Sequence, residues 1–136
     1  ISRNESEQKA AVILATVKGD IHDIGKNIVK VVLESHGYRV IDLGKNVDEE
    51  TIAEAYRQHH PAAIGLSALM TTTVDSMELC ISHLRNSGIH CPVIVGGAVI
   101  TENIAHNIGA DHYAKDALSA VDVMEKITAG TNWYDI

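Results

Sequence analysis

The sequence of 136 residues contains no phenylalanine, one tryptophan and four tyrosines. A core that lacks aromatic side chains must be filled by aliphatic ones, so we expect valine, isoleucine, leucine and alanine to build it. Cysteine is also scarce: Cys80 and Cys91 are the only two, and they form no C-x-x-C pair. This usage argues against a disulfide framework and predicts reduced thiols in a cytoplasmic protein.

Positive charge is in the minority as well. The chain carries 11 Lys and Arg against 18 Asp and Glu, a formal net charge of −7. An acidic balance argues against nucleic acid or an anionic membrane surface as the main partner. No apolar stretch approaches the ~20 residues of a membrane-spanning helix, and the polar start, residues 1–9, has no signal-peptide core. We therefore expect neither a nucleic-acid nor a membrane partner.

What is present is a regular alternation of apolar runs and helical patterns, joined by short loops. The apolar runs predict strands at Val12–Val17, Arg39–Leu43, Ala63–Ser67, Val93–Val95 and His112–Ala114. The helical patterns predict helices at Gly25–His36, Asp48–His59, Thr73–Asn86, Thr101–Ile108 and Leu118–Thr128. Strict alternation predicts an α/β fold, a single doubly wound five-stranded parallel sheet of the flavodoxin/Rossmann-like type, with strand order 2-1-3-4-5.

Local signals and length agree with this arrangement. Asp48 and Thr101 are expected helix N-caps. Glycines stand where helices are expected to end, at Gly37, Gly88, Gly109 and Gly130. The length suits one domain. We expect that domain at residues 11–130, a polar segment at 1–10 and a C-terminal tail at 131–136.

The predicted strand order brings three unusual loops together. It places strand 1 beside strand 3, where the winding direction reverses, and open α/β sheets bind ligands at the carboxyl ends of the strands there. The loops after strands 1, 3 and 4 contain, in turn, Asp20 to Gly25, Ser67 to Thr73, and Gly96 to Ala98. We expect these loops to line one crevice.

His22 is the strongest candidate for a metal ligand. A neutral imidazole binds transition metals, and its second ring nitrogen usually donates to a carboxylate that fixes the tautomer. Asp20 stands two residues before His22, and Asp23 is a competitor for the same role. The plain alternative is a polar loop in which His22 only caps the following helix.

Two nucleotide-binding motifs are excluded in this loop. A phosphate-binding P-loop needs four residues between its glycines and a serine or threonine after its lysine. Here five residues separate Gly19 from Gly25, and Asn27 follows Lys26. The dinucleotide fingerprint G-x-G-x-x-G is also absent after the first strand.

Three short motifs stand in the three loops: Asp20-x-His22-x-x-Gly25, Ser67-Ala-Leu69 and Gly96-Gly97. In this order and spacing they resemble the cobalamin-binding domains of corrinoid methyltransferases and cobalamin mutases, over about residues 11–126. The resemblance implies cobalamin bound base-off and His-on, with His22 as the lower axial ligand of cobalt. It also implies that the displaced nucleotide tail enters a slot between the sheet and its helices.

The resemblance implies roles for further residues. Asp20 and Thr73 complete a ligand triad with His22, and Thr73 stands where the family's relay has a serine or threonine hydroxyl. Gly96 and Gly97 leave room for the planar base of the tail. The full set of implied cofactor contacts is Gly19, Asp20, Ile21, His22, Asp23, Gly25, Ser67, Leu69, Thr71, Thr73, Gly96, Gly97, Tyr113 and Ala117.

The segments Val17–Ile28, Ile41–Val47 and Leu66–Thr73 resemble the methyltransferase branch, and within it cobalamin-dependent methionine synthase and its corrinoid-protein relatives. The leading expectation is the corrinoid module of a homocysteine methyltransferase, using methylcobalamin and cob(I)alamin. A corrinoid shuttle protein for methanol, methylamine or methoxyaromatic demethylation is the close alternative. An adenosylcobalamin mutase subunit and a cobalamin sensor module also stay open.

The methyltransferase branch also implies a helical cap domain before the first strand. Residues 1–10 are therefore expected to be the remnant of a linker from a missing cap domain, or else the upper face of the corrin is open to a partner. The implied partners are methyl-donor and methyl-acceptor methyltransferase domains or subunits and a reactivation partner. A chain that holds cobalamin without these partners is not expected to turn over alone. Outside the resemblance, a flavodoxin-like phosphoacceptor domain needs an acidic cluster at the strand ends. Asp20 and Asp23 supply only part of such a cluster.

Overall fold

A computed structural model describes residues 9–133, so most of the expected N-terminal polar segment (1–10) and residues 134–136 of the expected tail lie outside it. The elements are β1 (Ala11–Thr16), α2 (Ile24–Ser35), β2 (Arg39–Asp42), α3 (Glu49–His59), β3 (Ala63–Ser67), α4 (Thr71–Asn86), β4 (Val93–Gly96), α5 (Glu102–Asn107), β5 (His112–Tyr113) and α6 (Ala117–Trp133). The strands form one parallel sheet in the order β2-β1-β3-β4-β5. The predicted fold class and strand order are confirmed.

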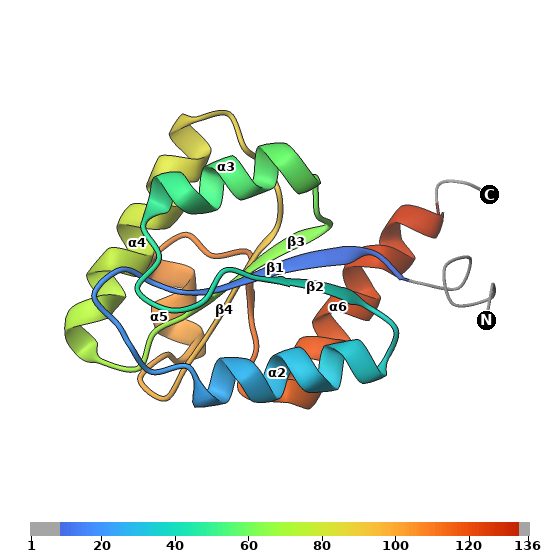
Figure 1. Ribbon diagram of the computed structural model, residues 1–136, viewed down its shortest axis with the longest axis horizontal. Coiled ribbons are helices and arrows are strands. Elements are labelled where there is room, and N and C mark those ends of the chain that lie inside the picture. Colours follow the sequence, from blue (N-terminus) through green and yellow to red (C-terminus); the bar gives the residue numbers. More distant parts are fainter. Residues whose placement is uncertain (1–8, 134–136) are drawn as a thin grey trace.

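Helices cover both faces of the sheet (Figure 1). α2 and α6 pack together on one face, and α3, α4 and α5 cover the other. Side chains of β1 alternate between the two layers: Val12 and Leu14 join the α2–α6 cluster, whereas Ile13 and Ala15 join the opposite one. Each buried aliphatic side chain contributes roughly 1.5–3 kcal/mol. β1 is therefore firmly held, and so is the point where the loop after it begins.

Some helix boundaries differ from the sequence prediction. α4 begins at Thr71, two residues earlier than expected, so Thr73 lies in a helical turn rather than in a loop. α6 continues through Gly130 to Trp133, and Gly130 therefore does not end a helix. A glycine ends a helix where the chain turns into the left-handed region, as Gly37 does with φ 94°. Among the described helices, none is long and apolar enough to span a membrane.

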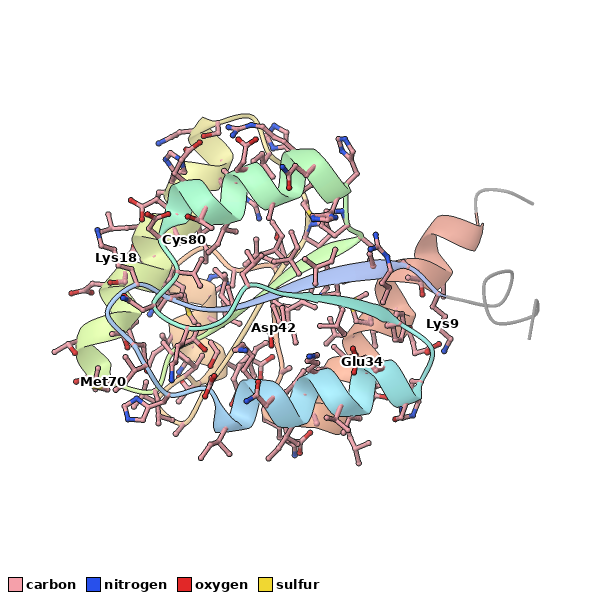
Figure 2. All side chains as sticks on the ribbon, in the orientation of Figure 1. Lys9, Lys18, Glu34, Asp42, Met70 and Cys80 are labelled. Atoms are coloured by element: carbon pink, nitrogen blue, oxygen red, sulfur yellow. The ribbon has the colours of Figure 1, made fainter. Side chains whose placement is uncertain are left out.

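The carboxyl ends of β1, β3 and β4 lie level with one another. Thr16 pairs with Ser67, and Ser67 pairs with Gly96, so the last residues of the three strands form one row. The loops that leave this row are the three that carry the sequence motifs. Side chains project from the sheet and the helices into the space between the layers (Figure 2), and the row of strand ends gathers the motifs at one edge of the sheet.

Candidate functional site

Asp20, in the β1–α2 loop (residues 17–23), is the centre of the hydrogen-bond network at this edge. Its side chain is fully buried. Oδ1 accepts the backbone N–H of His22 at 3.0 Å and lies 2.8 Å from Nδ1 of the same residue. Oδ2 accepts the backbone N–H of Leu69 and the hydroxyl of Thr73, each at 2.7 Å. One carboxylate therefore ties the β1–α2 loop to the segment that follows β3.

The electrostatics keep this carboxylate ionised. Burial raises the pKa of Asp20, but the hydrogen bonds from Leu69, Thr73 and His22 together outweigh burial and hold the pKa well below its usual range. An ionised carboxylate only accepts hydrogen bonds, so the Nδ1 that faces it carries the proton. The Nε2 of a neutral His22 then keeps its lone pair free to bind a metal.

His22 presents its ring to a cavity. The side chain is 46% exposed although its Nδ1 contacts a fully buried carboxylate. Asp23, the competing carboxylate, lies at the N-cap of α2 and makes no side-chain cap hydrogen bond. The structure thus pairs His22 with Asp20, the first of the two candidates.

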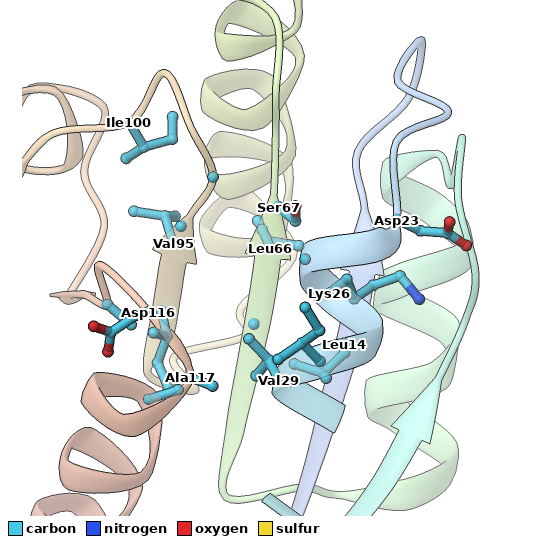
Figure 3. A pocket seen from close by; sticks show the side chains of 18 of the residues that line it. Leu14, Asp23, Lys26, Val29, Leu66, Ser67, Val95, Ile100, Asp116 and Ala117 are labelled. Carbon is cyan, nitrogen blue, oxygen red and sulfur yellow. The ribbon is translucent and has the colours of Figure 1, made fainter. Parts of the chain in front are cut away.

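The cavity has a volume of about 710 Å³ and lies between the sheet and the α2–α6 layer. Figure 3 shows four of the side chains that line it: Leu66 and Val95, near the ends of β3 and β4, Val29 of α2 and Ala117 of α6. The predicted site residues that line it are Ile21, His22, Asp23, Gly25, Ser67, Leu69, Gly96, Gly97, Tyr113 and Ala117. The structure therefore brings most of the predicted set to one space.

Four predicted site residues do not line the cavity. Asp20 and Thr73 are buried behind His22, where they contact each other. Gly19 is exposed at the crest of the β1–α2 loop, and its N–H donates to Asn46 Oδ1 at 2.8 Å. Thr71 is exposed at the first residue of α4.

The glycines of the site have different physical reasons. A Cβ on Gly97, whose φ is +130°, would lie 1.9 Å from the carbonyl oxygen of Ala68, and one on Gly96 would lie 2.9 Å from that of Ala114. The backbone of neighbouring loops therefore gives these two glycines a reason of its own, and their contact with a ligand stays a prediction. Gly25 has no such constraint: its φ is not positive, and a Cβ there would meet no atom within 4 Å.

Several residues of the site lie outside the predicted set. Val29, Leu33, Ala120 and Met124 line the cavity from α2 and α6. Their periodicity on the helices is that of ordinary core residues, so no sequence signal separates them from the core. Lys26 is buried beside the cavity, with Nζ 2.6 Å from Asp42 Oδ1 and 3.3 Å from Asn27 Oδ1.

Within residues 9–133, no group of three or more His, Cys, Asp or Glu side chains is placed to hold a metal ion. A metal held by the single imidazole of His22 must bring most of its ligands with it, as a macrocyclic complex does. A large and mainly apolar cavity beside one histidine fits such a complex.

Comparison with known proteins agrees with this geometry. The B12-binding domain family model matches residues 10–122. Trimethylamine corrinoid protein 1 of Methanosarcina acetivorans is 40% identical over 129 residues, which make up 93% of this chain and 58% of that protein. Dimethylamine corrinoid protein 1 of Methanosarcina mazei is 38% identical over 128 residues, 93% of this chain and 59% of that protein. The chain thus spans less than two thirds of the length of these relatives.

Solved structures give the same picture. A cobalamin-binding protein from Desulfitobacterium hafniense superimposes with a TM-score of 0.84 at 36% identity, covering 88% of this chain and 59% of that one. A methanol:cobalamin methyltransferase complex from Methanosarcina barkeri contains a chain with a TM-score of 0.86 at 33% identity. The match covers 90% of this chain and 48% of that one. A Francisella response-regulator receiver domain shares only the fold, at 16% identity and a TM-score of 0.70. The match covers 90% of this chain and 99% of that one.

Proposed function

The chain belongs to the B12-binding domain family, whose cofactor is cobalamin, and on that premise we propose that it is the corrinoid-carrying module of a methyltransferase system. The observation that carries this proposal is the Asp20–His22 pair at the mouth of the cavity. The Nδ1 of His22 is committed to Asp20 at 2.8 Å, and the half-exposed ring leaves Nε2 for the metal. His22 is therefore the proposed lower axial ligand of cobalt.

The cavity supports a place for the nucleotide tail. Its wall is formed mainly by aliphatic side chains of the sheet, α2 and α6, a surface that suits a planar base. Gly25 is a second reason to place the cofactor in this cavity. A methyl group would fit at residue 25 without a clash with the protein, and alanine is the better helix former. A glycine that the fold itself does not require is explained when a ligand passes close to the backbone.

The residues around the ring have distinct proposed tasks. Asp20 fixes the tautomer and the direction of the His22 ring, and Thr73 holds the second carboxylate oxygen at 2.7 Å. A carboxylate bonded to the ring strengthens its basicity as a ligand. When bound, cobalamin supplies a cobalt ion that takes up and releases a methyl group.

The kind of methyltransferase system is inferred from the named relatives. The two corrinoid proteins reported above carry trimethylamine and dimethylamine in their names, and the complex carries methanol. They favour a corrinoid shuttle for methylated amines or methanol over the leading expectation, a homocysteine methyltransferase module. We propose residues 11–130 as the carrier module, working in the cytoplasm with methyl-donor, methyl-acceptor and reactivation partners.

The proposal is tested by methyl loading of the chain after a chemical reductant has converted its bound cobalamin to cob(I)alamin, the form that accepts a methyl cation. Methyltransferases specific for trimethylamine, dimethylamine or methanol are mixed in turn with the loaded chain and their substrate, and methylation of the corrin is followed by absorbance. We expect one of these pairs to methylate the wild-type chain and to fail with His22→Ala. If the corrin is methylated only with a homocysteine methyltransferase partner, the chain is instead a homocysteine methyltransferase module.

A further inference from the structure

We propose that Asn46, in the loop between β2 and α3, is a positioning residue that holds the β1–α2 loop in the shape that presents His22 to the cofactor. The inference rests on the proposed function, since it concerns the same histidine. Asn46 is itself exposed and does not line the cavity. Its effect must therefore pass through the residues that it contacts.

Asn46 makes two hydrogen bonds to adjacent residues of the β1–α2 loop. Its side-chain Oδ1 accepts the N–H of Gly19 at 2.8 Å, and its own N–H donates to the carbonyl of Asp20 at 2.9 Å. Because the bonds run in opposite directions, they fix both the position and the orientation of this stretch of backbone. Asp20 in turn lies 2.8 Å from the ring of His22, so its placement sets where the imidazole lies.

Asn46 is itself firmly attached to the sheet. The N–H of Val47 donates to the carbonyl of Thr16 at 3.0 Å, and the N–H of Thr16 donates to the carbonyl of Gly44 at 2.9 Å. Gly44 donates its own N–H to Asp42 Oδ1, also at 2.9 Å. The residues on both sides of Asn46 are thus bonded to the end of β1 or to β2, which gives the clamp a rigid base.

The crest of the β1–α2 loop is closed by a backbone hydrogen bond from the N–H of Asp20 to the carbonyl of Val17 at 3.1 Å, and the N–H of Gly19 is left to Asn46. Lys18 and Gly19 are exposed, and Gly19 has a φ of 89°, a conformation that most residues avoid. The simpler explanation of Asn46 is that it only serves its own turn, since its φ of 54° is one that asparagine tolerates. That explanation accounts for the backbone of residue 46 but leaves the bond from Gly19 without a role.

Two substitutions separate these explanations. Asn46→Gly keeps the left-handed backbone and removes the side-chain acceptor, whereas Asn46→Asp keeps an oxygen acceptor. His60→Gly is the matched control, because His60 is the other non-glycine residue with a positive φ (47°) in residues 9–133, and it lies at the end of α3. Both positions are outside the cavity wall.

The first readout is amide hydrogen exchange at Gly19 in the cofactor-free chain, measured by NMR. Loss of one hydrogen bond is expected to speed exchange roughly fivefold in Asn46→Gly. Asn46→Asp should restore the wild-type rate, and His60→Gly should leave it unchanged. An Asn46→Gly chain with unchanged exchange at Gly19 would overturn the proposal.

The second readout is the visible spectrum and affinity of the chain with hydroxocobalamin. We expect Asn46→Gly to bind roughly fivefold more weakly and to show a smaller His22-ligated fraction, with recovery in Asn46→Asp. If the wild-type chain shows ligation by His22 and Asn46→Gly shows the same ligation and affinity, the role of Asn46 is overturned and the proposed function is not. A folded wild-type chain that does not bind hydroxocobalamin would overturn the proposed function and this role together.

Discussion

At the scale of single residues, the chemistry of the site depends on where one carboxylate lies. Asp20 is fully buried, and N–H and O–H donors from three other residues occupy its oxygens. A buried anion needs such donors, because desolvation otherwise disfavours its charged form. The same network leaves Oδ1 facing His22, so the stabilisation of the carboxylate and the orientation of the imidazole have one cause.

Gly25 gives a prediction at this scale. Gly25→Ala should leave the fold intact and raise the free energy of unfolding by up to about 1 kcal/mol, because alanine favours a helix and no atom lies within 4 Å of the added methyl. The same methyl should weaken cobalamin binding by on the order of tenfold, as overpacked sites lose 1–3 kcal/mol. Urea unfolding of the cofactor-free chain and cobalamin titration measure the two effects. Equal affinity of both chains would mean that the cofactor does not approach Gly25.

How far the sequence predicts the site differs from residue to residue. Asp20 and His22 lie two positions apart, so their contact could be predicted from the loop alone. Asn46 could not be, because its bonds to Gly19 and Asp20 join loops that are distant in sequence. The sequence does not predict the backbone constraint on Gly97 either, because the carbonyl of Ala68 that lies beside it belongs to another loop.

At the scale of elements, a buried ion pair joins α2 to β2. Lys26 Nζ lies 2.6 Å from Asp42 Oδ1, and their side chains are 2% and 20% exposed. Asp42 also accepts the N–H of Gly44 at 2.9 Å. Burial raises the pKa of Asp42, but the hydrogen bonds from Lys26 and Gly44, together with the positive charges of Lys26 and Lys30, lower it by more, so the net shift is downward. The pair fixes the first turn of α2, which begins directly after the β1–α2 loop.

Breaking this pair should destabilise the chain in a pH-dependent way. Asp42→Asn leaves a buried ammonium, and we expect it to lower the free energy of unfolding by about 3 kcal/mol at pH 7. Because the pKa of Asp42 is lower in the folded chain than in the unfolded one, its ionised form stabilises the fold at pH values above the unfolded-state pKa of about 4. This stabilisation is lost as the pH falls through the folded-state pKa. The difference between wild type and variant should therefore shrink below about pH 4 in urea unfolding.

The matched variant is Lys26→Met with Asp42→Asn, which removes both charges. It should recover much of the lost stability, because no buried charge remains unpaired. A stability difference between wild type and Asp42→Asn that stays constant from pH 7 to pH 3 would show that the ionised pair is not its source.

Most elements follow from hydrophobic pattern alone. β1 alternates between two buried layers, and the N-caps Asp48 and Thr101 accept the backbone N–H groups of Thr51 and Ile104, as their residue types predict. The start of α4 was placed too late. The hydroxyl of Thr73 bonds to Asp20 at 2.7 Å from within the first turn, a tertiary contact that no local pattern reveals.

At the scale of the whole molecule, the two faces of the sheet differ. The α3–α4–α5 face is filled by a large aliphatic core, whereas the α2–α6 face encloses the cavity of about 710 Å³. The strand order and the motif positions predict an opening at this edge of the sheet. Its depth could not be predicted, because it depends on how closely α2 and α6 approach the strands. The open face is the one that the proposed function requires.

Filling the cavity should separate binding from stability. Ala120 is buried on α6 and lines the cavity, so we expect Ala120→Leu to reduce cobalamin affinity by at least about tenfold while changing the free energy of unfolding by less than about 1.5 kcal/mol. Ala129→Leu makes the same change at an exposed position of the same helix and should leave affinity unaltered. Cobalamin titration and urea unfolding of both variants provide the comparison. An equal loss of cobalamin affinity in both variants would place the nucleotide tail of the cofactor outside this cavity.

The most direct test of the account is the ultraviolet–visible spectrum of the hydroxocobalamin-loaded chain, compared with His22→Ala. His83→Ala is the matched control, since His83 also contacts a carboxylate, Glu50 at 2.9 Å, but does not line the cavity. The account predicts displaced dimethylbenzimidazole and imidazole ligation in the wild type and in His83→Ala, with the ligation lost in His22→Ala. An identical spectrum in all three chains, or no binding by the folded wild type, would contradict it.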